Sequence, residues 1–391
     1  MSSAQLLSAA EVIDQTPSYI IDLDGIRETA VRMRNAWRAQ FPDFVLAYSY
    51  KTNSVPAVTQ LLRGLGCGAE VVSGSELELA LDDGFSGGQI YFDGPHKTDD
   101  ELDLALRHGA RIQIDSLDEA RRLVVRPLAK GARVSARVAG LRNGQEASRF
   151  GLTTSEFCEA DRILARGGVA ISGVHFNTGF HDEDATAFVA HIRHYGPLIQ
   201  RYTDRRSKAE PFVIDIGGGF PSRSTLTRRH VLPHPAEFAT AVGQAIDQLG
   251  LDRAAISLVI EPGRSLVEDH GVLVTTVVAV KHRADVRIAV VDAGTNLVRS
   301  ITLWPHPTRF LRAGSAVTDV VGSMCFENDY FARGVSAPID LKAGDRFMVD
   351  AAGGYDLPSA NVWLRPRPAI YAVNGDSKPK IIRERGKAIR P

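Results

Sequence analysis

The sequence is dominated by a repeated alternation of short apolar segments with longer amphipathic ones. Eight short segments, rich in Val, Ile and Phe, lie between residues 44 and 263, and each is typical of a buried strand. They are FVLAYSY (44–50), AEVVS (69–73), QIYFD (89–93), RIQID (111–115), RVSARV (133–138), VAISGVHFN (169–177), FVIDIGG (212–218) and SLVIEPG (257–263). Amphipathic segments such as 55–65, 98–109 and 234–250 separate them, which indicates parallel pairing through right-handed crossovers. Eight such units predict a closed α/β barrel of the (β/α)8 or TIM type.

The alternation ends near residue 265, where strands follow one another without helices between them. The expected strands are 271–281, 286–294, 316–322, 345–353 and 369–373. This pattern predicts a C-terminal antiparallel β domain, which also takes in an early strand at 17–25. The expected organisation is an N-terminal strand over 1–25, the barrel over 26–268 and the β domain over 269–391. The basic tail KPKIIRERGKAIRP (378–391) is expected to be a solvated end rather than a binding arm.

Composition narrows the partners of the chain. The 391 residues hold 46 Lys and Arg against 46 Asp and Glu, so net charge gives no reason to expect nucleic acid or a membrane surface as partner. Three cysteines without a CxxC pair argue against a disulfide scaffold and against a structural zinc site, and no metal is expected. The N-terminus carries no signal-peptide pattern and no apolar run is long enough to span a bilayer, which predicts a cytoplasmic enzyme.

Polar residues gather where the predicted barrel strands end. Barrels of this kind build their active sites at the C-terminal ends of the strands, so residues far apart in sequence meet at one mouth. The residues expected there are Lys51, Glu70, Ser73, Arg137, His175, Asn177, Gly217, Gly218, Gly219, Glu261, Gly263 and Arg264.

Two features of this set have both a structural and a chemical interpretation. Lys51 interrupts an apolar strand; either its amine extends to solvent at the strand end, or the mouth holds an amine of lowered pKa that forms a Schiff base. The triple glycine 217–219 either makes a tight turn or offers backbone N–H groups that cradle a phosphate. Gly263 and Arg264 would then add a second turn and a cation beside it.

Glu261 completes the set. It either forms an ion pair with a neighbour such as Arg264, or binds the protonated nitrogen of a pyridine ring and keeps that ring an electron sink. A lysine, a phosphate cradle and a ring-facing acid are together far more specific than any one of them. In combination they predict pyridoxal 5′-phosphate (PLP) as cofactor.

The motifs resemble those of one enzyme family. AYSYKTN (47–53), AEVVSGSELELAL (69–81), VIDIGGGF (213–220), EPGRSLV (261–267), VDAGTNLVR (291–299), GSMCFENDYF (322–331) and AAGGYDLPSANVWLRPRPA (351–369) occur in this order along nearly the whole chain. They are similar to motifs of the barrel-type (fold type III) PLP-dependent decarboxylases, the family of diaminopimelate, ornithine and arginine decarboxylases.

The resemblance implies roles for individual residues. Lys51 would carry PLP, and Tyr355 would join the glycines and Arg264 at the phosphate. Glu70, Arg137, His175 and Asn177 would line the cofactor site; Arg299, Arg149, Phe326 and Glu327 would face the substrate. The family also implies a head-to-tail homodimer in which the cysteine and tyrosine segments of one subunit complete the partner's mouth. Cys325 would then donate the proton to Cα, as Lys51 could, whereas Cys67 and Cys158 are expected to be buried apolar thiols.

Three segments depart from the family pattern. The sixth barrel strand reads His175-Phe176-Asn177-Thr178-Gly179-Phe180, so an asparagine replaces the histidine that stacks on the PLP ring, and Phe180 replaces a phosphate-binding serine. His175 either compensates or is a core histidine. Phe326 replaces the glutamate that contacts the distal end of the substrate, with Glu327 one position on. The aromatic residue that follows the substrate-binding arginine is displaced, the nearest being Trp304.

The predicted function is PLP-dependent α-decarboxylation of an amino acid or amino-acid conjugate, through Schiff-base exchange and a quinonoid intermediate. The departures favour an altered substrate, such as a carrier-linked amino acid, in a specialised pathway such as siderophore or antibiotic biosynthesis. Diaminopimelate decarboxylation, giving lysine, is the alternative within the family. Outside it stand an amino-acid racemase, a non-catalytic PLP-binding protein and a barrel that binds another phosphorylated ligand.

Overall fold

The computed structural model describes residues 4–179, 182–205, 210–375 and 378–388. Within these residues, eight parallel strands close into a barrel in the order β10-β11-β2-β3-β4-β5-β6-β9. Their bounds are β2 (Phe44–Ser49), β3 (Gly68–Val71), β4 (Ile90–Phe92), β5 (Arg111–Ile114), β6 (Val134–Arg137), β9 (Ile171–His175), β10 (Phe212–Asp215) and β11 (Ile256–Ile260). Each lies within or beside one of the predicted segments, and the barrel expected from the sequence is confirmed.

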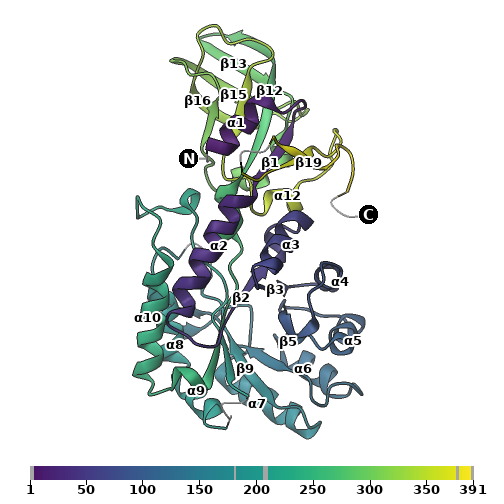
Figure 1. Ribbon diagram of the computed structural model, residues 1–391, viewed down its shortest axis with the longest axis vertical. Helices are drawn as coiled ribbons and strands as arrows, with labels where there is room; N and C mark the ends of the chain where they lie inside the picture. Colours follow the sequence, from purple (N-terminus) through teal and green to yellow (C-terminus); the bar gives the residue numbers. More distant parts are fainter. Residues whose placement is uncertain (1–3, 180–181, 206–209, 376–377, 389–391) are drawn as a thin grey trace.

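Helices surround the barrel in the lower half of Figure 1. They are α2 (Leu23–Arg38), α3 (Pro56–Gly64), α4 (Gly74–Asp82), α5 (Asp99–His108), α6 (Leu117–Val124), α7 (Thr154–Arg166), α8 (Thr186–His194), α9 (Gly196–Thr203), α10 (Pro235–Gln248) and α11 (Arg264–Val267). Several begin at a hydroxyl that caps the first turn: Thr98 and Thr153 each form a capping box with a glutamate three residues on. Their apolar faces pack on the barrel, as Val58 and Leu62 of α3 do.

A nine-stranded sheet forms the second part of the described chain, at the top of Figure 1. Its main path is β16-β15-β13-β12-β1-β18-β19, and β14 and β17 extend it beside β12. The bounds are β1 (Ser18–Asp22), β12 (Gly271–Arg283), β13 (Val286–Val291), β14 (Thr308–Phe310), β15 (Ala316–Val321), β16 (Tyr330–Ala337), β17 (Arg346–Val349), β18 (Ala369–Val373) and β19 (Lys380–Arg383). As expected, β1 joins this sheet, where it lies between β12 and β18.

Two details of this sheet correct the sequence prediction. The sheet is mixed rather than antiparallel, because β1 runs parallel to β18 and β13 runs parallel to β15. The basic tail is not wholly a solvated end, because β19 pairs with β18 and the Arg383 side chain is buried. Helix α1 (Ala4–Val12), which was not predicted, packs Leu6 and Ala10 against this sheet in a small separate core.

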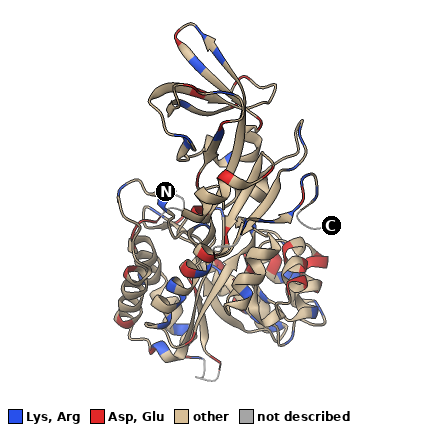
Figure 2. Ribbon diagram, turned by 45° about the horizontal axis from the view of Figure 1, so that its top comes forward, with Lys and Arg blue, Asp and Glu red and all other residues tan. Residues whose placement is uncertain are grey.

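Lys and Arg positions, in blue, and Asp and Glu positions, in red, are interspersed along the barrel helices in Figure 2. Among the residues that the structure describes, no helix combines the length and apolar character needed to cross a bilayer. The cytoplasmic location stays a prediction. A short helix, α12 (Asp356–Ser359), and a two-stranded hairpin of β7 (Leu141–Arg142) and β8 (Gln145–Glu146) complete the elements that matter below.

Candidate active site

Lys51 lies directly after strand β2, in a single 3-10 turn formed by Tyr50–Thr52. Its amine lies 2.6 Å from both carboxylate oxygens of Glu70, which is buried on β3. Ser49 donates a second hydrogen bond to the same carboxylate. The Lys51 side chain remains 40% exposed, so the amine is held in place by Glu70 while solvent or a ligand can reach it.

The electrostatics of this amine differ from the sequence prediction. Burial lowers the pKa of Lys51, but the carboxylates of Glu70 and Glu261 outweigh it and the pKa is raised above its usual range. The expected lowered pKa is therefore wrong for the chain by itself. A nucleophilic amine at this position requires that a ligand or a neighbouring group first take up the proton.

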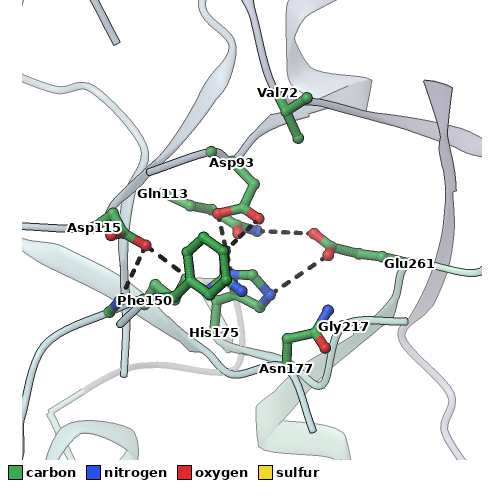
Figure 3. Close-up of polar contacts among 12 residues, drawn as sticks. Val72, Asp93, Gln113, Asp115, Phe150, His175, Asn177, Gly217 and Glu261 are labelled. Carbon is green, nitrogen blue, oxygen red and sulfur yellow. Dashed lines mark hydrogen bonds and ion pairs between the residues drawn. The ribbon is translucent and has the colours of Figure 1, made fainter. Parts of the chain in front are cut away.

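The floor of the mouth is built around His175, at the end of β9 (Figure 3). Its side chain is fully buried, with Nδ1 3.6 Å from Asp93 and Nε2 3.4 Å from Glu261. The amide nitrogen of Gln113 on β5 lies 3.5 Å from the other carboxylate oxygen of Glu261 and donates a 2.7 Å hydrogen bond to Asp215. Burial, Asp215 and Glu70 raise the pKa of Glu261 well above its usual range.

Arg137, at the end of β6, is held by carboxylates on both sides. It donates a 3.0 Å hydrogen bond to Asp93, and its Nε lies 3.8 Å from Asp115. Its guanidinium also lies 4.7 Å from the centroid of the Phe150 ring, which reaches over the floor in Figure 3. Arg149, the neighbouring predicted substrate contact, is exposed and stacks on the outer side of Phe150 at 3.8 Å.

The triple glycine turns at the end of β10, beside Asn177. Gly217 and Gly219 have positive φ angles of 69° and 95°, and a Cβ at Gly218 would lie 2.6 Å from the Glu261 carbonyl oxygen. Among the described residues, the N–H groups of Gly218 and Gly219 donate to no protein acceptor. Two free amides in a loop that excludes side chains fit an anionic group such as a phosphate.

A second feature of the mouth also fits a polar ligand. A Cβ at Gly263 would lie 2.0 Å from the hydroxyl of Thr52, the residue after Lys51. This hydroxyl is buried and has no hydrogen-bond partner among the described residues. An unpartnered buried hydroxyl against Gly263 is a further donor that a polar ligand at the mouth could use.

Arg264, predicted as a phosphate ligand, is already engaged within the chain. Its guanidinium pairs with Glu268, which also accepts a hydrogen bond from Ser222. Its guanidinium carbon lies 4.3 Å from the Trp304 ring centroid and 4.9 Å from that of Tyr355. The side chain therefore ties the end of β11 to the glycine-rich segment and to the C-terminal part of the chain.

Tyr355 lies at the mouth of its own barrel, because its N–H also donates to the Thr52 carbonyl at 2.7 Å. This corrects the expectation that the tyrosine segment serves the partner. Cys325, Phe326 and Glu327 are instead exposed on the loop between β15 and β16, and no interaction among the described residues joins them to the mouth. Arg299 is also exposed, in the 3-10 turn Arg299–Thr302, and forms no ion pair with a described residue.

The sixth strand explains the role of Asn177. Its Oδ1 accepts the N–H of Gly179 at 2.9 Å, and Figure 3 places its side chain next to Gly217. Asn177 thus stabilises the turn and does not present a ring to a ligand. Phe180 lies outside the described residues.

Sequence reasoning missed several residues that the fold brings to the mouth. These are Thr52, Asp93, Gln113, Asp115, Phe150, Asp215 and Trp304. Asp93, Asp115 and Asp215 end or follow β4, β5 and β10, so the rule that located Lys51 and Glu261 could have found them. Trp304 carries no such signal.

Fold and site together define a (β/α)8 barrel with a lysine, a buried acid and a glycine cradle at one mouth. A family model described as "Pyridoxal-dependent decarboxylase, pyridoxal binding domain" matches residues 27–268. The diaminopimelate decarboxylase of Methanothermobacter thermautotrophicus is 31% identical over 400 residues, covering 96% of this chain and 91% of that protein. That of Bacillus subtilis is 30% identical over 395 residues, covering 94% and 89%.

Solved structures agree with this assignment. The diaminopimelate decarboxylase of M. jannaschii superposes with a TM-score of 0.87 at 25% identity, over 98% of this chain and 92% of that one. A lysine/ornithine decarboxylase from Vibrio vulnificus has the same fold, with a TM-score of 0.81 at 20% identity over 95% and 97% of the two chains. The chain belongs to the pyridoxal-dependent decarboxylase family, and its reaction class is amino-acid decarboxylation.

Proposed function

We propose that this chain binds PLP at the barrel mouth, attached to Lys51, and removes the α-carboxylate of an amino acid. The observation that carries the proposal is the joint placement of the Lys51 amine, the buried Glu261 carboxylate and the free amides of Gly218 and Gly219 at one mouth. Bound there, PLP supplies an electron sink for the electron pair released when the carboxylate leaves.

Residues of the chain bind and orient the cofactor and move protons. Gly218, Gly219 and Thr52 supply hydrogen-bond donors for the phosphate, while Arg264 acts by holding their loops in place. Glu261 would hold the pyridine nitrogen of the cofactor and, as an anion, would favour its protonated form. Glu70 orients Lys51 and exchanges a proton with its amine.

We further propose that the protein acts as a homodimer in which Cys325 reaches the partner's mouth. This is supported by the exposure of Cys325 on a loop away from its own mouth. The neighbouring apolar side chains of Phe326 and Trp363 are also about half exposed, at 51% and 49%. Such an apolar surface favours burial against a second copy. Cys325 would there protonate Cα after carbon dioxide has left.

Two substrate classes fit these observations. Diaminopimelate is supported by the relatives, whose similarity covers nearly the full chain and whose names carry this activity. An amino acid or conjugate with a less polar distal end is favoured by Phe326, whose ring lies 6.5 Å from that of Trp363 and offers no charge to a distal ammonium. Exposed Arg299 and Arg149 are candidates for a distal acidic group in either case.

The test begins with the visible absorbance of the purified protein reconstituted with PLP. Wild type should show the yellow band of a lysine-bound cofactor, and Lys51→Ala should lack it. Lys97→Ala is unsuitable as a control because Lys97 is buried with Glu119, whereas exposed Lys281→Ala leaves the site untouched. A Lys51→Ala protein that keeps the band would refute the attachment.

Carbon dioxide release from a panel of amino acids and carrier-linked amino acids, including diaminopimelate, then identifies the substrate. Loss of optical rotation without carbon dioxide would instead indicate racemisation. Mixing Lys51→Ala with Cys325→Ala subunits tests the shared site, because hybrid dimers hold one intact mouth and regain activity. Failure to regain any activity would contradict the shared arrangement.

A further inference from the structure

His175 occupies a position with no simple structural explanation. Its side chain is fully buried, yet neither ring nitrogen has an ordinary hydrogen bond among the described residues. Instead, Nδ1 points to Asp93 at 3.6 Å and Nε2 points to Glu261 at 3.4 Å (Figure 3). The imidazole edge, not its face, is directed at the acid on the floor of the mouth.

The charge state of the imidazole follows from this arrangement. A neutral imidazole has one N–H and one lone pair, so one of the two buried carboxylates would face a lone pair. An imidazolium has an N–H on both sides and donates towards both carboxylates. Since an unpaired charge is costly to bury, the doubly protonated ring is the state that matches Asp93 and Glu261 as anions.

The groups around this array are mainly acidic. Asp93 also accepts a hydrogen bond from Arg137, and Glu261 lies close to Gln113. Other titratable and charged groups that act on the two carboxylates are Lys51, Glu70, Tyr91, Lys97, Asp115, Arg137 and Asp215. Lys97 pairs with Glu119 and Lys51 with Glu70, so neither supplies an uncommitted charge to the floor. His175 is then the group able to balance Glu261.

The pKa values of the two carboxylates are shifted in opposite directions. For Asp93, burial raises the pKa, but His175 and Arg137 outweigh it and the pKa lies well below its usual range. Among the described residues Glu261 forms no ion pair with an arginine, and Arg137 acts on it only at longer range. Burial together with Asp215, Glu70 and Asp93 raises the pKa of Glu261, and this increase outweighs the opposing effect of Lys51. Without a positive neighbour Glu261 would take up a proton and lose its ability to hold a pyridine nitrogen protonated.

We propose that His175 is a positioning residue that carries a positive charge, binds Asp93 and Glu261 through its two ring nitrogens, and so keeps Glu261 anionic beneath the cofactor. The inference rests on the proposed function, because Glu261 matters in this way only when PLP is bound. It assigns a role to His175 in a chain that has Asn177 at the position of the family's ring-stacking histidine. The histidine acts through Glu261 and does not replace the missing ring.

The direct test is nitrogen NMR of 15N-histidine-labelled holoenzyme, with His175→Gln used to assign the signal. At pH 8, where an ordinary histidine is neutral, His175 should still show two protonated nitrogens. Asp93→Asn removes one of the two acceptors, and the doubly protonated signal should weaken at the same pH. If His175→Gln does not fold, His175→Asn provides the assignment, and a neutral tautomer at pH 8 in wild type would overturn the proposal.

A second readout is the pH dependence of the cofactor's visible absorbance. In His175→Gln the midpoint of this absorbance titration should shift by about one pH unit or more. Because each pKa unit changes the ionised fraction tenfold, kcat should fall roughly tenfold or more, while KM should change by less than about threefold. His191→Gln is the matched control: it is also buried, but its ring bonds only to the backbone of Ala187 and Leu141.

The outcomes distinguish failure of the inference about His175 from failure of the proposed function. Wild type without the visible band would refute the proposed function itself. A band that titrates identically in wild type and His175→Gln would refute the inference alone. Asp93, His175 and Glu261 lie close enough to be ligands of one cation. If the protein binds Zn²⁺ stoichiometrically and His175→Gln abolishes this binding, the proposed positive charge on His175 is also overturned.

Discussion

The guanidinium of Arg264 lies 4.3 Å from the centroid of the Trp304 ring, and this contact joins the end of β11 to the segment before β14. The ring centroid of Tyr355 lies 4.9 Å from the same guanidinium. Glu268 contacts one of its nitrogens. An arginine with these three contacts holds the residues around it, including Gly263, at the mouth.

Replacing Trp304 tests this positioning. A partly desolvated cation–π contact contributes roughly 0.5–2 kcal/mol, which corresponds to about 2- to 30-fold in a binding constant. Trp304→Leu should weaken PLP binding to the apo enzyme by this factor, and Trp304→Phe should lose less. Equilibrium dialysis measures both. Phe41→Leu removes a comparable arginine–ring contact, the one with Arg253 at 5.4 Å before β2, and should leave the affinity unchanged. Equal losses in the two variants would contradict the stacking role.

Glu268 makes stability depend on pH. Its carboxyl is fully buried, and burial, only partly offset by Arg264 and Ser222, raises its pKa from 4.5 to about 7. The native state therefore holds a proton that the unfolded chain releases. The stabilisation is complete below pH 4.5, falls as pH rises and is lost above pH 7, a change of roughly 3 kcal/mol.

Denaturant unfolding at pH 5 and pH 8 checks this sign. Glu268→Gln keeps a neutral, hydrogen-bonding side chain at both values, so its unfolding free energy should change less than that of wild type. Glu327→Gln, at an exposed carboxylate, should follow wild type. Parallel behaviour of wild type and Glu268→Gln would show that this carboxyl does not titrate as stated.

The fold could be predicted because the barrel strands carry a strong local signal. Each is a short apolar run bounded by an amphipathic helix, and burial on both faces makes that run nearly continuous. Strands β14, β16 and β19 were missed for physical reasons. β14 has three residues, β16 is half exposed, and β19 lies at an edge where Lys380 and Arg383 resemble a solvated tail.

The site could be predicted only as far as strand position specifies it. Lys51 and Glu261 follow their strands directly, so the barrel rule places them at one mouth. The partners of a side chain depend on long-range packing, which no local pattern encodes. The sequence therefore predicts Arg264 as a phosphate ligand, although Glu268, Trp304 and Tyr355 contact its guanidinium in the structure.

Asp329 fixes the loop that presents Cys325. Its carboxylate accepts the N–H and hydroxyl of Thr295 at 2.7 and 2.9 Å and the N–H of Met324 at 2.9 Å. Asp329→Asn turns one acceptor towards a donor and leaves a buried group unpaired, at a cost of about 1–3 kcal/mol. We expect faster amide exchange over residues 322–329 and an altered rate of Cys325 modification by a thiol reagent.

The control for the loop is Asn328→Asp, which changes charge on the same loop at an exposed position. Its amide exchange should match wild type. If Asp329→Asn leaves exchange over 322–329 unchanged, the loop is held by its backbone turn alone. Loss of decarboxylation in Asp329→Asn with retained PLP absorbance would connect the loop to the reaction and not to cofactor binding.

Gly263 is the position where the mouth tolerates no side chain. A Cβ there would lie 2.0 Å from the Thr52 hydroxyl and 3.1 Å from the Ser49 Cβ, both on the segment that carries Lys51. Gly263→Ala should cost about 1–3 kcal/mol of stability and displace Thr52, which weakens PLP binding. Adding Thr52→Ala removes the worst contact and should restore part of the stability without restoring the affinity.

Gly64→Ala, on helix α3 with no atom within 4 Å of its Cβ, should be neutral or stabilising by up to about 1 kcal/mol. Thermal unfolding and PLP titration of the four proteins distinguish a steric effect at the cradle from a general glycine effect, and equal behaviour of Gly263→Ala and Gly64→Ala would contradict the close approach.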